Sequence, residues 1–167
     1  MAYYKSSDNS VYYLDAVDAD NWQQWLPGGV VAITDAEAMA ITNPPPTLAE
    51  AQATRIALLN QAYQGAITAP VSYTTLAGAE ASFGQSGKDK ANLQNAISGS
   101  LAGGVWGLDL WLDVNGNLIT PFTYADLQGL AAAMESADIP EFTHLLDKVA
   151  AVQAATTVAD VEAIAWV

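Results

Sequence analysis

The chain has 167 residues, 51% of them hydrophobic, and 18 acidic against 5 basic side chains give it a formal net charge of -13. It is long and apolar enough to bury a core, and because it contains no cysteine, disulfides, thiolate nucleophiles and cysteine metal sites are excluded. So negative a charge repels nucleic-acid phosphates and anionic lipid head groups, and no apolar run approaches the roughly 20 residues that span a bilayer. We therefore expect no nucleic-acid partner and no membrane insertion. Since residues 1–5 are not a basic segment followed by an apolar run, we also expect no secretory signal.

The first part of the chain, up to about residue 33, alternates strand-forming residues with turn residues. Short strands are predicted at 11–14, after the turn residues 8–10, and at 30–33, after Pro27-Gly28-Gly29. Between them Trp22 and Trp25 are three residues apart, a spacing that places both side chains on one face of a helical turn. We expect both indoles to be core or partly buried packing residues of a small module.

Three consecutive prolines at 44–46 mark the best candidate domain boundary. They follow a short predicted helix, 36–41, that Thr34 or Asp35 can cap. Proline fixes φ and favours an extended chain, so this run ends the helix and is interpreted as a spacer. Docking to a proline-binding partner is the alternative, which the lack of flanking basic residues disfavours. The sequence thus predicts a small β-rich module over 1–43 and a second domain over 44–167.

The second domain is predicted to be mainly helical with short β-hairpins, so that the whole chain has an α+β fold. Thr47 and Glu50 have the spacing of a capping box that opens a helix to about residue 64. Asn115-Gly116 predicts the turn between strands at 105–112 and 117–120. The glycine-rich stretch 98–104 lacks the phosphate-loop patterns and is predicted to be a plain loop. Further elements are predicted as a hairpin over 71–83 and as helices over 86–97, from 123 to Pro140 and from Pro140 to about 149. A last helix is capped by Thr156 or Thr157 and ends at Ile164 and Trp166.

No group of residues indicates a chemistry. The stretch 113–117 superficially resembles the start of a calcium loop, but its twelfth position is Tyr124 instead of glutamate and its glycine comes two places early. The lone His144 has no nucleophile or acidic partner in its local pattern. The acidic residues between 15 and 20 are interpreted as a solvated loop. We therefore predict no catalytic residue, no metal and no cofactor.

Two successive parts of the sequence resemble bacteriophage proteins. Paired aromatics at Tyr3-Tyr4, a second aromatic strand at Tyr12-Tyr13, then Leu26-Pro27 and the run Ile33-Thr34-Asp35-Ala36-Glu37 resemble the opening of tail-fibre assembly proteins. From about residue 47 the chain is similar to the domain of unknown function often attached to that opening in phage and prophage proteins. The pieces that match are the helix around Arg55, the hairpin 71–83, the helix after Ser86, Trp111 before Asn115-Gly116, Phe122-Thr123 before Leu127, and the end from 155–157 through 164–166.

The resemblance implies a function without catalysis. It implies a chaperone that binds the distal, C-terminal region of a trimeric tail fibre in the host cytoplasm, and that in some members stays on the virion tip. Because Tyr and Trp dominate interface energetics, the candidate fibre contacts are Tyr3, Tyr4, Tyr12, Trp22 and Trp25. That these aromatics form the module's own core is an equally open reading. The alternative function is a structural tail-tip component that itself contacts the host receptor, and the sequence leaves the oligomeric state open.

Overall fold

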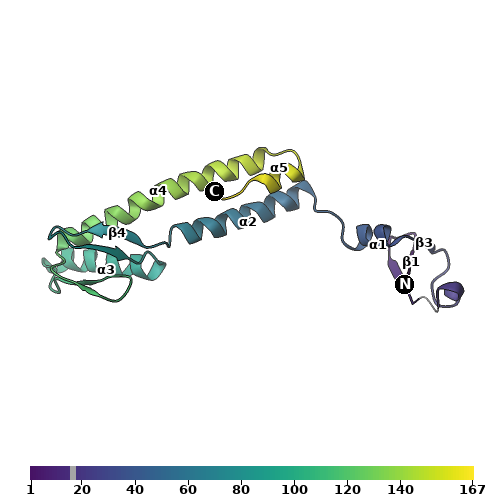
Figure 1. Cartoon of the computed structure of the whole chain (residues 1–167), viewed down its shortest axis with the longest axis horizontal. Helices are drawn as coiled ribbons and strands as arrows, with labels where there is room; N and C mark the ends of the chain where they lie inside the picture. The colour runs from purple at the N-terminus through teal and green to yellow at the C-terminus, as the bar shows by residue number, and fades with distance from the viewer. Residues whose placement is uncertain (16–17) are drawn as a thin grey trace. The chain divides into compact units, whose positions relative to one another are not determined.

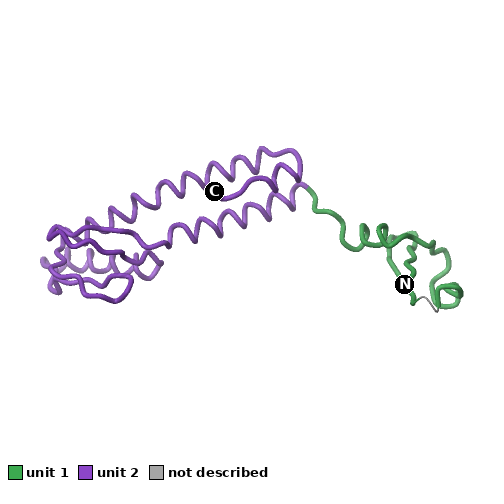
Figure 2. The backbone as a smooth tube through the Cα atoms, in the orientation of Figure 1, with its two compact units in different colours: residues 1–47 green, residues 48–167 purple. Residues whose placement is uncertain are grey.

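Short antiparallel strands and helices make up an α+β fold in the computed structural model, which describes residues 1–15 and 18–167 (Figure 1). The chain divides into two units, residues 1–47 and 48–167, drawn in green and purple in Figure 2. The prolines at 44–46 precede the first helix of the second unit. In the described part of the chain, no helix combines the length and the apolar character needed to cross a bilayer.

The first unit is built on a three-stranded antiparallel sheet. Its central strand pairs with one neighbour on each edge, in the order β2-β1-β3. Glutamate at the third position of the first helix accepts a hydrogen bond from the Thr34 amide at 2.8 Å, and the Thr34 hydroxyl accepts one from the Glu37 amide, which confirms the predicted cap. In chain order the elements are β1 (Ala2–Lys5), β2 (Val11–Leu14), the 3-10 helix η1 (Ala19–Gln24), β3 (Val31–Ile33) and α1 (Asp35–Thr42).

The second unit combines two long helices with a smaller part made of a helix and two hairpins. Helices α2 and α4 run side by side, α5 returns onto α2, and α3 lies with the hairpins beside the first half of α4 (Figure 1). The elements are α2 (Leu48–Ala66), β4 (Val71–Thr74), β5 (Glu80–Phe83), α3 (Gly87–Gly103), β6 (Trp111–Leu112), β7 (Leu118–Ile119), α4 (Tyr124–Ala154) and α5 (Val158–Ala163).

Two clusters of buried side chains hold this unit together, one at each end of α4. The first joins the hairpins, α3 and the start of α4 through Phe83, Leu93, Phe122, Leu127, Leu130 and Met134. The second joins α2, α5 and the end of α4 through Ala51, Leu59, Leu145, Val152 and Val161. Both clusters contain residues of α4, so this helix connects the two ends of the unit.

A buried carboxylate ties the start of α4 to the hairpin β4–β5. Asp126 is fully buried and accepts hydrogen bonds from the Thr123 amide at 2.8 Å and the Leu76 amide at 2.7 Å. The hydroxyls of Thr123, at 2.6 Å, and Tyr73, at 3.2 Å, donate to the same carboxylate. Burial alone would raise the pKa of Asp126, but these hydrogen bonds outweigh burial and lower the pKa below its usual value. The carboxylate is therefore charged in the folded protein near neutral pH.

Three predictions about the second unit were wrong. Pro140 does not separate two helices, because α4 continues through it and the proline ring faces solvent. The glycine-rich stretch 98–104 is not a loop: α3 continues to Gly103, and Gly104 ends it with a left-handed φ of 79°. The strand predicted at 105–112 is limited to Trp111–Leu112.

Tertiary packing explains each of these differences. Burial of the second half of α4 against α2 and α5 outweighs the ~3 kcal/mol that proline costs inside a helix. Helix α3 extends past residue 97 because Ala96 and Ile97 pack against the first cluster and Ser100 is buried, with its hydroxyl donating to the Ala96 carbonyl one turn back. The segment before β6 is irregular because the Trp106 indole packs on the first cluster and donates to the Phe122 carbonyl at 2.7 Å.

Candidate functional site

The structure divides the five predicted contact aromatics of the first unit into buried and accessible side chains. Tyr4 is only 4% exposed, and its hydroxyl donates to the Ala19 carbonyl at 3.1 Å. Its ring lies 5.2 Å from that of Trp22, which is half-buried. Tyr4 and Trp22 therefore pack together in the core of the module, and contact with a partner through Tyr4 would require the module to open.

The other three aromatics reach the surface in different places. Tyr12 is half-buried and lies opposite Tyr4 in the sheet, so it shares the face of that core pair. Tyr3 is half-buried on the other face, opposite Tyr13, which is 66% exposed. Trp25 follows η1 and is 64% exposed, so the prediction that it is a core or partly buried residue like Trp22 was wrong. The accessible aromatic surface of this unit thus consists chiefly of Trp25 and of Tyr13, a residue that was not among the predicted contacts.

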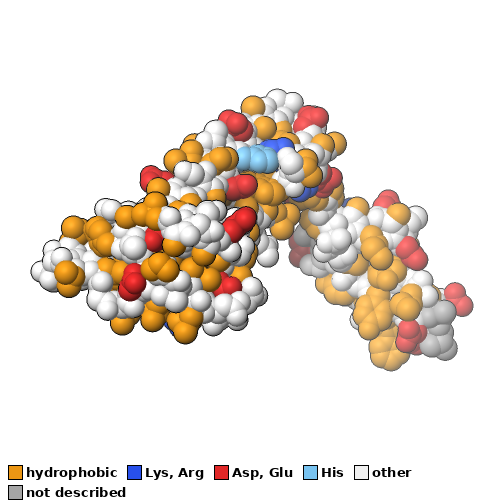
Figure 3. All heavy atoms as spheres, turned by 60° about the vertical axis from the view of Figure 1, so that its left-hand side comes forward, with side chains coloured by type: hydrophobic (Ala, Val, Ile, Leu, Met, Phe, Trp, Pro, Cys, Tyr) orange, Lys and Arg blue, Asp and Glu red, His pale blue; other side chains and the backbone are white. Residues whose placement is uncertain are grey.

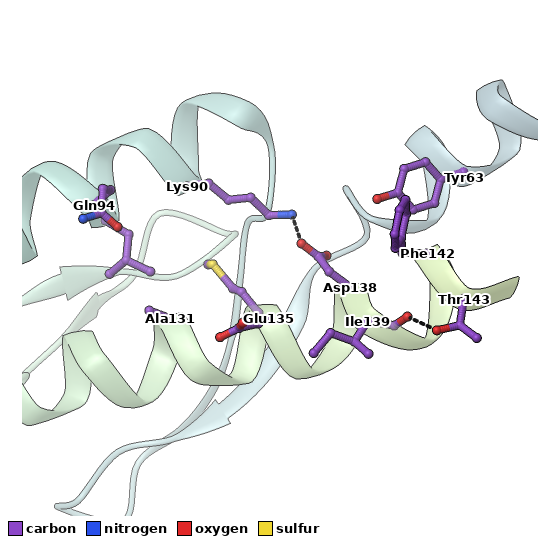
Figure 4. A pocket seen from close by; sticks show the side chains of 11 residues that line it. Tyr63, Lys90, Gln94, Ala131, Glu135, Asp138, Ile139, Phe142 and Thr143 are labelled. Atoms are coloured by element: carbon purple, nitrogen blue, oxygen red, sulfur yellow. Dashed lines mark hydrogen bonds and ion pairs between the residues drawn. The ribbon is translucent and has the colours of Figure 1, made fainter. Parts of the chain in front are cut away.

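A groove in the second unit lies between α2, α3 and α4 and encloses about 440 Å³ (Figure 4). Its lining is mostly apolar, with Leu93, Ala131 and Met134 among its residues. At one end the rings of Tyr63 and Phe142 lie 6.1 Å apart. The groove therefore offers an apolar surface closed at one end by two aromatic rings.

An ion pair crosses this groove from α3 to α4. The Lys90 Nζ atom lies 2.6 Å from Asp138 Oδ2 and also donates to the Ile67 carbonyl at 3.1 Å (Figure 4). Both side chains are partly exposed, so this pair contributes at most about 1 kcal/mol to the free energy of unfolding. No nucleophile, base and orienting group are aligned in the groove, and in the described residues no cluster of three potential metal ligands is found.

Asp113 and His144, which the sequence analysis considered for metal binding and catalysis, both make contacts within the second unit. Asp113 accepts hydrogen bonds from the amides of Asn115 and Asn117 and from the Asn117 side chain, which lowers its pKa and holds the hairpin turn. Gly116 takes the positive φ, 82°, that this turn requires. The His144 ring stacks on Trp166 with centroids 4.5 Å apart. These contacts give both residues a role in packing the second unit.

The hairpin β6–β7 exposes a second apolar surface. We call Leu108, Leu112, Val114 and Leu118 the hairpin surface, because all four side chains are exposed and belong to this hairpin or its flanking loops. Three of them, all except Leu118, line a hollow of about 580 Å³. On the face of the molecule seen in Figure 3, hydrophobic side chains cover broad areas and acidic side chains outnumber basic ones.

Comparison with known proteins identifies a family for the second unit. Residues 50–165 match the family described as a domain of unknown function, DUF4376, and the chain belongs to this family. The match runs from the start of α2 to the segment after α5, which agrees with the resemblance found from about residue 47. No curated protein and no solved structure matches the chain.

Proposed function

We propose that the protein is a phage tail-fibre assembly chaperone without catalytic activity, which binds the distal C-terminal region of a trimeric fibre in the host cytoplasm. The observation that carries the proposal is the order of two parts on one chain. An opening that resembles tail-fibre assembly proteins, with Tyr3-Tyr4, Tyr12-Tyr13 and the run 33–37, precedes the DUF4376 domain. Neither part alone points as specifically to fibre assembly.

The surface chemistry supports this proposal. Fibre chains that have not yet trimerised expose apolar side chains and unpaired strand edges, which lead to aggregation unless they are covered. The protein offers accessible apolar groups for such contacts in both units, among them Trp25 and the hairpin surface. Its net charge of -13 keeps copies of the protein apart and favours a basic partner surface over an acidic one.

Coexpression with the fibre encoded by the neighbouring gene tests the proposal. The yield of soluble trimeric fibre is measured by size-exclusion chromatography with light scattering, with and without this protein. We expect soluble trimer to depend on the protein and to remain low when residues 48–167 are replaced by an unrelated acidic domain. Equal trimer yields in the presence and absence of the protein would overturn the chaperone proposal.

Analysis of purified particles separates the alternative function. If fibre trimers form without the protein and the protein is nevertheless present in particles, the chain is a tail-tip component that contacts the host receptor. A chaperone that leaves the fibre after assembly would be absent from particles, whereas one that stays on the tip would be required for trimer formation and also be present. The two measurements together therefore distinguish all three cases.

A further inference from the structure

Two kinds of lining residues meet in the hollow beside β6. From β6 and its flanking loops come Leu108, Leu112 and Val114, whose side chains are 64%, 53% and 48% exposed. From α3 come Asp89 and Asn92, which are three residues apart and therefore share one face of that helix. The volume of about 580 Å³ is within the ~300–1,000 Å³ of typical ligand pockets. The hollow thus combines exposed apolar side chains with polar groups from a neighbouring helix.

The charged groups of this hollow are all acidic. Asp89 and Asp113 line it, and among its lining residues in the described part of the chain none is basic. Asp113 is fixed in the hairpin turn, where its carboxylate accepts hydrogen bonds from the Asn115 and Asn117 amides at 2.8 and 2.7 Å. Carboxylates beside exposed apolar side chains favour a partner group that has a positive charge at the end of an apolar stem.

Asp89 keeps one carboxylate oxygen free for such a group. Its Oδ2 atom accepts hydrogen bonds from the amide and the hydroxyl of Ser86, at 3.0 and 2.6 Å. Within the described residues no donor is bound to its Oδ1 atom, and this oxygen is not buried. Gly84, which also lines the hollow, leaves room for the carboxylate, because a Cβ on Gly84 would lie 2.6 Å from Asp89 Oδ2. The helix cap therefore fixes Asp89 before a partner arrives and leaves Oδ1 as a charged acceptor.

We propose that this hollow binds an arginine side chain of a partner protein. The alkyl stem of the arginine packs on Leu112 and Val114, and its guanidinium donates to Asp89 Oδ1 and is attracted by the charge of Asp113. Arginine suits the hollow better than lysine, because a guanidinium is less strongly hydrated than an ammonium and carries five N–H donors. That the partner is the C-terminal region of the fibre rests on the proposed function, whereas the preference for arginine is a property of this unit alone.

A pair of peptides tests the preference for a charged side chain. The blocked tripeptide leucine-arginine-leucine and its citrulline analogue, which has nearly the same shape without the charge, are titrated into 15N-labelled protein. We expect the arginine peptide to shift the amide resonances of Asp89, Asn92 and Asp113 saturably, and to bind at least about fivefold more tightly than the citrulline peptide. Equal affinities for the two peptides, or no saturable shifts with either, would overturn the inference.

Two variants of the hollow and one control separate this contact from the general negative charge of the protein. Asp89→Asn removes the charge and keeps the size of the side chain, whereas Gly84→Ala keeps every charge and displaces the Asp89 carboxylate. Asp147→Asn removes the same charge from an exposed position on α4 outside the hollow.

Thermal melting establishes first that each variant is folded. We expect the preference for arginine over citrulline to fall to within about twofold in both variants of the hollow, and to stay unchanged in Asp147→Asn. An unchanged preference in Asp89→Asn would overturn the inference, and so would an equal loss in the Asp147→Asn control.

Titration calorimetry with the purified C-terminal region of the fibre separates this inference from the proposed function. We expect Asp89→Asn to weaken fibre binding at least about fivefold and Asp147→Asn to leave it within about twofold. If the arginine peptide binds as expected and the fibre does not, the proposed function fails and the arginine site stands. If the fibre binds and the arginine peptide does not, the inference fails and the proposed function stands. Saturation of the same resonances by calcium chloride, with no preference between the peptides, would assign the hollow to a divalent cation and contradict the inference.

Discussion

Replacement of Asp126 by alanine tests how the second unit is held together. The substitution removes a fully buried carboxylate and leaves the Thr123 and Leu76 amides without their acceptor, together with the hydroxyls of Thr123 and Tyr73. Each buried donor left unsatisfied costs about 1–3 kcal/mol, and loss of an N-cap interaction costs about 1 kcal/mol. We therefore expect Asp126→Ala to lower the free energy of unfolding by about 3–5 kcal/mol, which is a large part of the ~5–15 kcal/mol of a typical domain.

Asp89 provides a matched control for this experiment. It stands at the same position of a capping box at the start of α3, where its carboxylate accepts from the Ser86 amide at 3.0 Å and from the Ser86 hydroxyl at 2.6 Å. Asp89 is only half-buried, and the hydrogen bonds found for it are those within this cap. Asp89→Ala should then cost about 1 kcal/mol, the value of a cap alone.

Urea unfolding followed by tryptophan fluorescence measures both variants, since Trp106 and Trp111 pack on the cluster that Asp126 supports. The difference between the two variants, about 2–4 kcal/mol, is the contribution of burial and of the bonds to Leu76 and Tyr73. Equal destabilisation by the two substitutions would refute the reasoning, because it would mean that Asp126 acts as an ordinary helix cap.

Three further predictions concern single positions in the second unit. Gly129→Ala should destabilise by about 1–3 kcal/mol despite the better helix propensity of alanine, because the new Cβ would lie 2.8 Å from Cζ of the Tyr73 ring, which packs on the first cluster. Gly99→Ala, with nothing within 4 Å of the new Cβ, should stabilise slightly, and equal melting shifts for the two variants would contradict this prediction. Pro140→Ala should raise the urea midpoint by an amount equivalent to about 1–2 kcal/mol, since proline has no N–H to donate within the continuous helix α4 and its ring is exposed; an unchanged or lower midpoint would count against it. The folded-state pKa of Asp126 is lowered, so the stabilisation that its carboxylate gives is present above the unfolded pKa of about 3.9 and is lost as pH falls through the folded pKa. The difference in free energy of unfolding between the unchanged protein and Asp126→Ala should therefore become smaller below pH ~4. A difference that does not change with pH would contradict this prediction.

Local signals in the sequence predicted most helix starts and the second hairpin. Thr34 with Glu37 caps α1 as expected, and Thr123 with Asp126 starts α4 where the spacing placed it. The Asn115-Gly116 turn was also confirmed, although only Gly116 has a positive φ. Such signals depend on a few neighbouring residues, so they can be recognised without knowledge of the tertiary structure.

The predictions that failed depend on contacts between distant elements. Proline at position 140 predicts a helix break from local rules, but packing of the second half of α4 against α2 and α5 keeps the helix continuous. The apolar run before β6 has the composition of a strand, and burial of the Trp106 indole instead holds it in an irregular path. Local propensity is a weak preference, and burial of large side chains overrides it.

The candidate site was only partly accessible to sequence reasoning. Aromatic content alone could not separate Tyr4, which is buried, from Tyr13, which is exposed, because the difference depends on which sheet face Trp22 covers. The hairpin surface did leave a signal, since the runs around Leu112 and Leu118 are apolar at successive positions where a half-buried strand would alternate. Which of these side chains point outward follows only from the register of the hairpin, which pairs Leu112 with Leu118.

Refolding of the fibre with purified components tests the proposed function most directly. The C-terminal region of the fibre is unfolded in denaturant and diluted into buffer with increasing amounts of this protein, and the trimer fraction is measured by size-exclusion chromatography with light scattering. Our account predicts that the trimer fraction rises with added protein and levels off near a stoichiometric ratio. A trimer fraction that is the same with this protein as with an unrelated acidic protein would contradict the proposed chaperone function.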